Sequence, residues 1–259
     1  YNFSEYLKEN NKLKKLVALF VILAAFLSLN NNSTFSQPQI KVHVTGGYNL
    51  PLPDLKGDLL DSADMINTLG MKSGFNAGAD VKYYLGKKRN VGITLGLTYN
   101  SFSNSMDSTT YSYKQKLNSF QAALGIEYSF MPKGKTQPYL GAEFTGNFFS
   151  GEATTTPTTG TETKFTLKSA SRFGVALGGG IDFAFSKSIG ANIGVKYHIA
   201  NLIGKDYDST VTIGATEFPL NDKEYTIGTT TIAAKTISYI QLSAGVSFFF
   251  NQPKKVVKK

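Results

Sequence analysis

The stretch Tyr239 to Phe250 (YIQLSAGVSFFF) decides the fold, because apolar and polar side chains alternate along it with a period of two. The even-numbered residues from Ile240 to Phe250 are apolar without interruption, and the odd-numbered residues from Gln241 to Ser247 are small or polar. Successive side chains of a β-strand point to opposite faces, so this segment is predicted to be a strand. An unbroken apolar face opposite a small, polar face is typical of a strand with lipid outside and a crowded polar lumen inside.

Seven segments upstream alternate in the same way. They cover residues 40–48, 74–83, 91–99, 120–128, 140–148, 172–185 and 189–198. About ten residues is the length that a tilted strand needs to cross the hydrocarbon layer. An even number of strands lets the sheet close, which leaves no edge without hydrogen-bond partners in lipid. The sequence therefore predicts an all-β fold, an eight-stranded antiparallel up-and-down transmembrane β-barrel.

The connections alternate between short turns and long polar loops. The short turns are residues 86–90, 131–136 and 186–188, and the long loops are approximately 49–71, 102–117, 150–169 and 201–235. This alternation predicts that both termini and the short turns are periplasmic and that four long loops are extracellular. Within the last loop, residues 211–220 and 225–234 are candidates to extend the last two strands. Aromatic side chains near the strand ends predict two girdles at the membrane interfaces.

The two ends of the chain carry most of its charge. The net charge is +9, of which residues 1–36 contribute +2 and the four lysines of 254–259 contribute +4. Lysines 8, 12, 14 and 15 precede the apolar run 16–29, which predicts a signal peptide over 1–36 with cleavage after Ser36. Residues 37–250 are then the outer-membrane barrel, and 251–259 are a basic periplasmic tail. Because so little charge remains on the barrel, we expect no nucleic-acid partner.

The composition argues against several kinds of site. The chain has no cysteine, which removes disulfides, thiolate metal ligands and cysteine nucleophiles. No residue pattern predicts a catalytic site, a bound metal or a cofactor, so we expect a protein that is not an enzyme.

The chain resembles the small OmpA-type outer-membrane barrels, and in particular the outer membrane protein beta-barrel domain family of Bacteroidetes-like bacteria. The resemblance covers about residues 39–250 and rests on the eight alternating strands, on Gln137 to Ala142 (QPYLGA) and on the closing Val246 to Phe250 (VSFFF). It implies a bacterial outer-membrane location, contact with outer-membrane lipids, and recognition of the last strand by the barrel-assembly machinery. Such barrels usually end at the terminal aromatic residue, whereas residues 251–259 follow it here.

Charged residues on the predicted lumen face are balanced in sign. They are Lys41, Lys82, Arg172 and Lys196 against Asp80, Glu127, Glu143 and Asp182. Since eight strands enclose only enough space for side chains, we expect these residues to pair across the lumen as a charge network that plugs it. The alternative is a selective pore lined by the same charges.

The histidines and a glycine run are weaker candidates for chemistry. His43 is predicted near the periplasmic mouth and His198 near the outer mouth, with Asp206, Asp208 and Ser209 close to His198 in sequence. No nucleophile motif surrounds them, so ordinary hydrogen bonding is the favoured interpretation. Residues 178–180 (GGG) resemble a phosphate-binding loop only superficially, and glycine there is expected to make room for a large neighbour.

Three functions are compatible with these features. The favoured one is a structural, adhesion or surface-interaction role through the four extracellular loops, with a partner that the sequence does not identify. The alternatives are a porin or transporter for small solutes or hydrophobic molecules, and a barrel enzyme that modifies lipid A.

Overall fold

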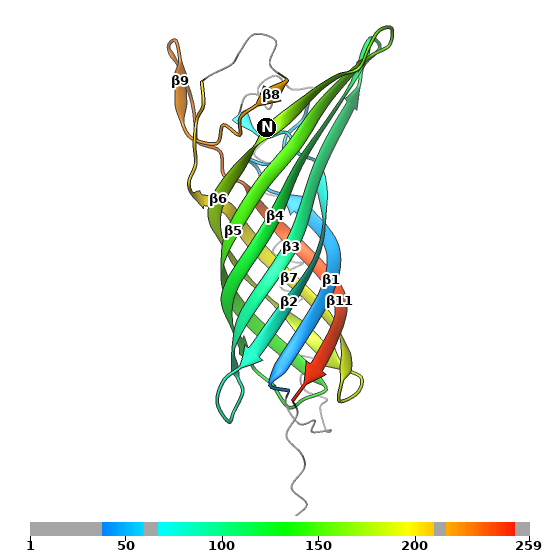
Figure 1. Cartoon of the computed structure of the whole chain (residues 1–259), viewed down its shortest axis with the longest axis vertical. Helices are drawn as coiled ribbons and strands as arrows, with labels where there is room; N and C mark the ends of the chain where they lie inside the picture. The colour runs from blue at the N-terminus through cyan, green and yellow to red at the C-terminus, as the bar shows by residue number, and fades with distance from the viewer. Residues whose placement is uncertain (1–37, 60–66, 210–215, 252–259) are drawn as a thin grey trace, which may run out of the picture.

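Eight long strands form the body of the molecule in the computed structural model, which describes residues 38–59, 67–209 and 216–251. The strands are β1 (Ile40–Pro51), β2 (Ser73–Tyr84), β3 (Val91–Asp107), β4 (Tyr111–Ser129), β5 (Thr136–Pro157), β6 (Thr163–Ala184), β7 (Ile189–Ile203) and β11 (Ser238–Phe250). The predicted signal peptide and residues 252–259 of the predicted tail lie outside the described residues. Figure 1 shows the strands tilted around a common axis.

The eight strands close into a ring of antiparallel neighbours. Each strand pairs with the next along the chain, and β1 pairs with β11 from Ile40 opposite Phe250 to Pro51 opposite Tyr239. Pairing of β5 with β6 completes the circle. The predicted eight-stranded up-and-down barrel is confirmed.

Two of the expected long loops are mostly strand. β3 and β4 remain paired from Val91 opposite Tyr128 to Asp107 opposite Ser112, and β5 and β6 remain paired as far as Thr155 opposite Thr163. The loops expected at 102–117 and 150–169 were therefore wrong, because only short connections at 108–110 and 158–162 separate these strands. Threonine, serine and tyrosine are common in these segments, which is why loops were predicted. Threonine and tyrosine also favour strands, and the backbone ladder continues past the predicted strand ends. Figure 1 shows these strands projecting as an arm at one end.

The last long connection also differs from expectation. β8 (Glu217–Phe218) pairs in parallel with β6, while β9 (Tyr225–Ile227) and β10 (Thr230–Ile232) form a small separate hairpin. These segments therefore do not extend the last two strands, and residues 210–215 lie outside the described part. Stacking of Tyr207 on Tyr225, with ring centroids 4.1 Å apart, joins the small hairpin to the connection that precedes it.

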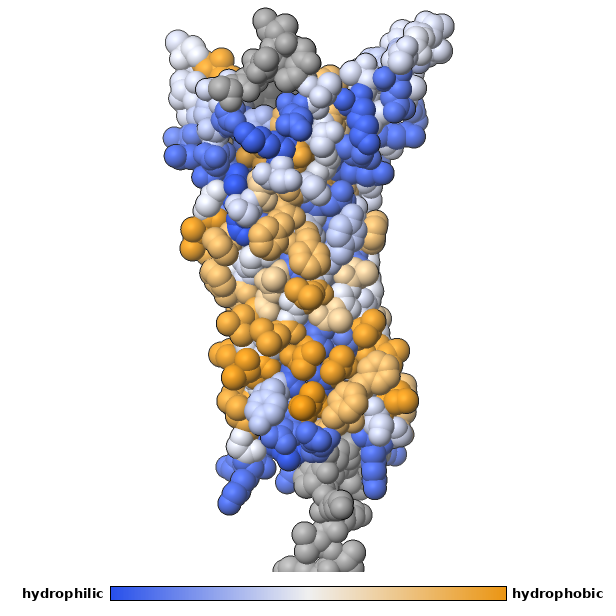
Figure 2. Space-filling view, in the orientation of Figure 1, coloured by the Kyte–Doolittle hydropathy of each residue, from blue (hydrophilic) through white to orange (hydrophobic). Residues whose placement is uncertain are grey.

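Large apolar side chains cover the outside of the barrel wall. Leu124, Ile126 and Leu140 are 56%, 62% and 57% exposed. The face drawn in Figure 2 carries a broad apolar surface over the lower part of the molecule. Soluble proteins rarely expose such a broad apolar surface, whereas a barrel in lipid requires it. Exposed aromatic residues lie near both ends of the wall, as the girdle prediction requires, with Tyr83, Tyr128, Phe130 and Phe250 at one end and Tyr48, Tyr99, Phe148 and Tyr197 at the other.

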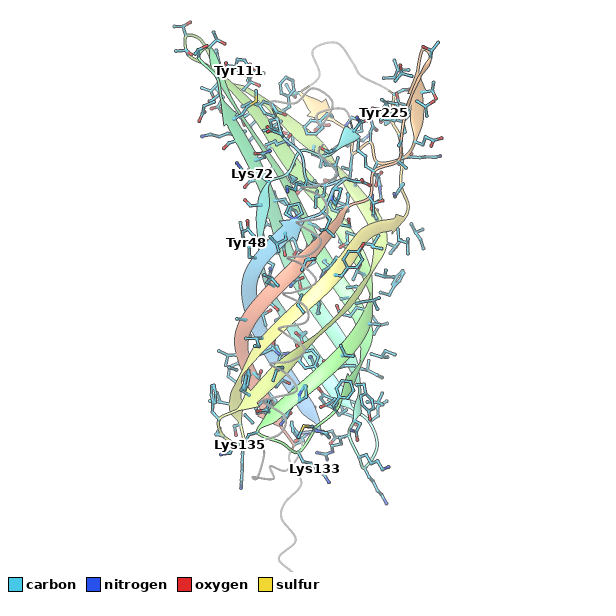
Figure 3. The ribbon with its side chains drawn as sticks, turned by 180° about the vertical axis from the view of Figure 1, so that it is seen from behind. Tyr48, Lys72, Tyr111, Lys133, Lys135 and Tyr225 are labelled. Carbon is cyan, nitrogen blue, oxygen red and sulfur yellow. The ribbon has the colours of Figure 1, made fainter. Side chains whose placement is uncertain are left out.

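The two ends of the barrel are built differently. We call the end that carries the three short turns the turn end, and the opposite one the loop end. Figure 3 shows Lys133 and Lys135 at the turn end and Tyr111 and Tyr225 at the loop end. Gly86, in the first short turn, has a φ of 67°, a left-handed conformation that glycine adopts without steric cost. Within the described residues, no helix has the length and apolar character needed to cross a membrane.

Candidate functional site

Six ionisable residues fill the lumen at the turn end, and we call them the turn-end cluster: Lys41, His43, Asp80, Lys82, Glu127 and Asp182. They come from four strands, and strand alternation points each of them inward. Lys41 Nζ lies 2.8 Å from Asp182 Oδ2, and both side chains are almost fully buried. Lys82 forms an ion pair with Glu127, which also accepts a hydrogen bond from the Tyr84 hydroxyl.

His43 links the two halves of the turn-end cluster. Its Nδ1 lies 3.2 Å from Asp80 Oδ1 and its Nε2 lies 3.1 Å from Asp182 Oδ1. Asn192 and Tyr139 support the same carboxylates and cations, since Asn192 donates to Asp182 at 2.7 Å and Lys82 Nζ lies 3.8 Å from the centre of the Tyr139 ring. Buried charges are tolerated only when they are paired and hydrogen-bonded in this way.

A small cavity of about 40 Å³ occupies the middle of the lumen, above the turn-end cluster. It has room for a few water molecules at most. Lys196 and Glu143 line it and form an ion pair with Nζ 2.6 Å from Oε1. These two side chains are partly exposed, so this ion pair is more accessible to solvent than the turn-end cluster.

Glycines make the room that these large side chains occupy. A Cβ at Gly178 would lie 2.7 Å from Lys196 Cγ, and a Cβ at Gly180 would lie 2.5 Å from the Tyr139 hydroxyl. A Cβ at Gly125 would likewise lie 2.6 Å from Glu143 Cγ. The glycine run at 178–180 therefore has a packing role inside a strand, as expected.

Neutral amide side chains fill the lumen beyond the cavity, and we call them the amide layer: Asn49, Asn76, Asn100, Gln121, Asn147 and Gln241. All six are buried. Asn49 donates to Asn100 at 3.0 Å and accepts from Asn76 at 3.0 Å, while Gln121 donates to Asn147 at 2.8 Å. Amides can donate and accept at once, so they cross-link neighbouring strands without burying net charge.

His198 belongs to this level of the lumen. Its ring stacks on Tyr239 with centroids 4.5 Å apart, and Nδ1 lies 3.4 Å from Gln121 Nε2. Asp206, which is near His198 in sequence, instead donates its backbone N–H to Asp222 at 2.9 Å. The structure therefore surrounds His198 with an aromatic ring and an amide.

An apolar cluster closes the loop end, and we call it the apolar plug: Leu55, Met71, Phe102, Leu117, Phe149, Leu167, Ala200, Leu220, Ile237 and Tyr239. The strands contribute Phe102 and Phe149 from the lumen face, and the connections contribute Leu55 and Leu220 from above. Phe102 and Tyr239 meet edge to face with centroids 5.0 Å apart. Burial of this apolar surface holds the connections down in the mouth of the barrel.

Sequence reasoning missed the amide layer and the apolar plug. A signal for both was present, because apolar Phe102, Leu117 and Phe149 are next to polar residues in the series of lumen-facing positions of the same strands. These positions lie just beyond the predicted ends of the strands, so the alternation was not followed that far. The connections that cover the plug have no periodicity of their own.

The eight residues of the predicted lumen charge network do not form one network. Lys41, Lys82 and Lys196 pair with Asp182, Glu127 and Glu143, and Asp80 lies against His43. Arg172 lies apart at the loop end, where its partner is Asp222 from the last connection. That partner was not predicted, because it comes from a segment expected to be an exposed loop. Among the described residues, no group of three or more histidine, aspartate or glutamate side chains is arranged to hold a metal ion.

A family model for the outer membrane protein beta-barrel domain matches residues 18–250. The chain belongs to this family. The match spans every strand of the ring, and membership places the protein in the bacterial outer membrane. A comparison with curated protein sequences finds no match.

Several solved outer-membrane structures are similar to this family member. Neisserial surface protein A is 16% identical over 82% of this chain and 97% of its own, with a TM-score of 0.44. The attachment invasion locus protein Ail of Yersinia pestis, in complex with the heparin analogue sucrose octasulfate, is 14% identical over 81% and 99%, with a TM-score of 0.38. The outer membrane protein OprG from Pseudomonas aeruginosa is 14% identical over 85% and 100%, with a TM-score of 0.39.

Proposed function

We propose that this outer-membrane barrel is closed to solutes and acts by presenting its loop end to partners at the cell surface. The filling of the lumen carries the proposal. The turn-end cluster, the amide layer and the apolar plug occupy successive levels, and a cavity of about 40 Å³ lies between the turn-end cluster and the amide layer. Eight strands leave little bore, and these side chains use it.

The loop end supplies the surface that a partner would meet. β3 to β6 continue beyond the membrane-spanning wall as the arm shown in Figure 1. Lys116, Glu152 and Lys164 tie its strands together through ion pairs, with 3.3 Å between Lys116 Nζ and Glu152 Oε1. We propose that this end is extracellular, because short turns and both termini are periplasmic in bacterial barrels of this kind. The last strand, β11, would then be what the assembly machinery recognises.

The two alternative functions have less support. A porin or transporter would need a continuous path, and the lumen holds three levels of paired or packed side chains. A lipid-modifying enzyme would need a nucleophile or general base at the rim, and the histidine nearest the loop end, His198, is 1% exposed and stacked on Tyr239. We therefore propose a role without catalysis.

Conductance tests closure directly. Purified protein reconstituted in a planar bilayer is expected to show no sustained current over a range of voltages. A stable, ion-selective current from the unmodified protein would contradict closure and favour the porin.

Shortening the arm tests the surface role. Residues 103–116 and 152–166 would each be replaced by a four-residue turn, which keeps Leu117 and Leu167 of the apolar plug, and attachment of expressing cells to surfaces and to one another would be measured. We expect attachment to fall while the barrel still assembles. The matched control replaces the short turn 86–90, which is expected to leave attachment unchanged. Equal attachment by cells with the unmodified protein, the arm variants and the control would contradict the proposal.

A further inference from the structure

A cavity of about 280 Å³ lies at the loop end, beside the apolar plug. One side is formed by Leu59, Leu69, Met71, Leu117, Leu167 and Leu220. Sites for drug-sized molecules measure roughly 300–1,000 Å³, so this cavity fits a somewhat smaller molecule. Its wall indicates that most of such a molecule would be apolar.

Most polar groups that line the cavity are already engaged. The Gln115 amide donates to the carbonyls of Leu69 at 3.1 Å and Gly70 at 2.8 Å. Lys116 pairs with Glu152, which also pairs with Lys164. Of the two lysines that line the cavity, Lys116 is paired with Glu152, and Lys235 has no ion pair within the described residues.

Lys235 is held in place by its backbone at the edge of the cavity. Its N–H donates to the Asp222 carbonyl at 2.9 Å, and its own carbonyl accepts from Asn201 Nδ2 at 2.9 Å. The residue is 9% exposed, and within the described ranges no carboxylate forms an ion pair with its ammonium group. The nearby carboxylate of Asp54 accepts from the backbone N–H of Thr236 at 2.8 Å.

The charge of Lys235 is therefore poorly compensated. Burial lowers the pKa of its ammonium group, and attraction to Asp54 offsets this only in part. A buried cation without a paired anion is unfavourable, and an anion that enters the cavity would relieve that cost.

We propose that this cavity binds a small amphiphilic monoanion, of the class of medium-chain carboxylates, with its carboxylate on Lys235 and its chain against the apolar wall. Lys235, the lining cation without an ion pair among the described residues, selects one negative charge, and the leucines and Met71 select an alkyl chain. A neutral ligand would leave the ammonium uncompensated, and a cationic ligand would be repelled by it. The proposal goes beyond the surface role, and it holds whether or not the lumen conducts.

Calorimetric titration with octanoate tests the site. The full-length protein would be reconstituted in phosphatidylcholine nanodiscs, and the heat of octanoate partitioning into empty nanodiscs would be subtracted. Affinity is expected to rise roughly fourfold per methylene from butanoate to octanoate, because each buried methylene contributes a similar increment. Acetate and octanol are expected to bind at least tenfold more weakly than octanoate, since each lacks one half of the recognised chemistry.

Two substitutions locate the binding. Lys235→Met keeps the length of the side chain and is expected to weaken octanoate at least tenfold with little effect on octanol. Lys223→Met removes an exposed lysine of the same connection and is the matched control, expected to leave binding unchanged. Leu69→Trp fills the cavity and is expected to abolish binding even if Lys235→Met fails to fold.

Three outcomes would overturn the proposal. They are absence of saturable octanoate binding, equal affinity for octanoate and octanol or acetate, and unchanged binding in Leu69→Trp. Circular dichroism of each variant shows whether its barrel is intact.

Discussion

Arg172 and Asp222 are joined at the loop end by a buried, doubly hydrogen-bonded ion pair, although they are 50 residues apart in the chain. Arg172 Nη2 lies 2.9 Å from Asp222 Oδ1, and Nε lies 3.0 Å from Oδ2. The same carboxylate accepts from Asn201 Nδ2 at 2.8 Å and from the backbone N–H of Asp206 at 2.9 Å. Asp222 thus fastens the last connection to the barrel wall.

Removing this carboxylate should release the connection. Asp222→Ala leaves Arg172 buried without its partner, so we expect stability to fall by about 3 to 5 kcal/mol, as for other broken buried pairs. Limited proteolysis should then cut within residues 204–237 faster than in the unmodified protein. Glu224→Ala, an exposed carboxylate of the same connection, is the control. Equal cleavage of the two variants would show that Asp222 is not the anchor.

The turn-end cluster predicts that a buried ion pair contributes more to the free energy of unfolding than an exposed one. Asp182→Ala leaves Lys41 and His43 without their shared carboxylate, and we expect a loss of about 3 to 5 kcal/mol in the free energy of unfolding. Glu152→Ala removes the carboxylate of an exposed arrangement and should change stability little. Urea unfolding in lipid vesicles measures both. A loss for Glu152→Ala as large as that for Asp182→Ala would contradict the buried cluster.

The apolar surface of the barrel wall predicts a cost of charge that depends on depth in the membrane. Leu124 faces outward near the middle of the wall, so Leu124→Arg should destabilise the barrel by about 2 to 4 kcal/mol. Tyr128 lies on the same face of β4 near the turn end, and Tyr128→Arg should cost about 0 to 1 kcal/mol. Vesicle folding titrations compare the two. If Leu124→Arg were tolerated as well as Tyr128→Arg, the positions assigned to the membrane would be wrong.

Cysteine labelling tests the proposed orientation, because the native chain has no cysteine. Thr159 lies in the exposed connection between β5 and β6. The variant Thr159→Cys should react with a membrane-impermeant maleimide in intact cells. Lys133, in an exposed short turn, should react as Lys133→Cys only after the outer membrane is permeabilised. The reverse labelling pattern would show that the turn end is extracellular and the loop end periplasmic, contrary to the proposed orientation.

Acid should loosen the arm. Hydrogen bonds from Lys164 and Lys116 hold the pKa of Glu152 below its ordinary value. A lowered folded-state pKa means that the stabilisation is present above the unfolded pKa of about 4.3 and is lost as pH falls through the folded one. Hydrogen exchange in β5 and β6 near residue 152, corrected for its intrinsic pH dependence, should rise over that interval. Glu152→Gln should remove the effect, and an identical pH response in that variant would refute it.

The strands could be predicted from the sequence because each one is recognised by the alternation of apolar and polar residues within its own segment. From Tyr239 to Phe250, the two faces meet lipid and lumen, so the period of two identifies the strand, its orientation and the closed ring that lipid demands. Lys41, His43 and Glu127 could be assigned to the lumen on the same ground. Parity within a strand states which face a side chain lies on.

The odd or even position of a residue along its strand does not determine which residue it contacts across the lumen. Only the tertiary structure decides those contacts. Partners across the lumen depend on the tilt and stagger of the strands, which bring Lys41 to Asp182 across 141 residues of chain. The pairing of Arg172 with Asp222 and the position of Lys235 at the cavity depend further on how an aperiodic connection packs on the apolar plug. Such packing is a property of many residues at once, so it leaves no local pattern in the sequence.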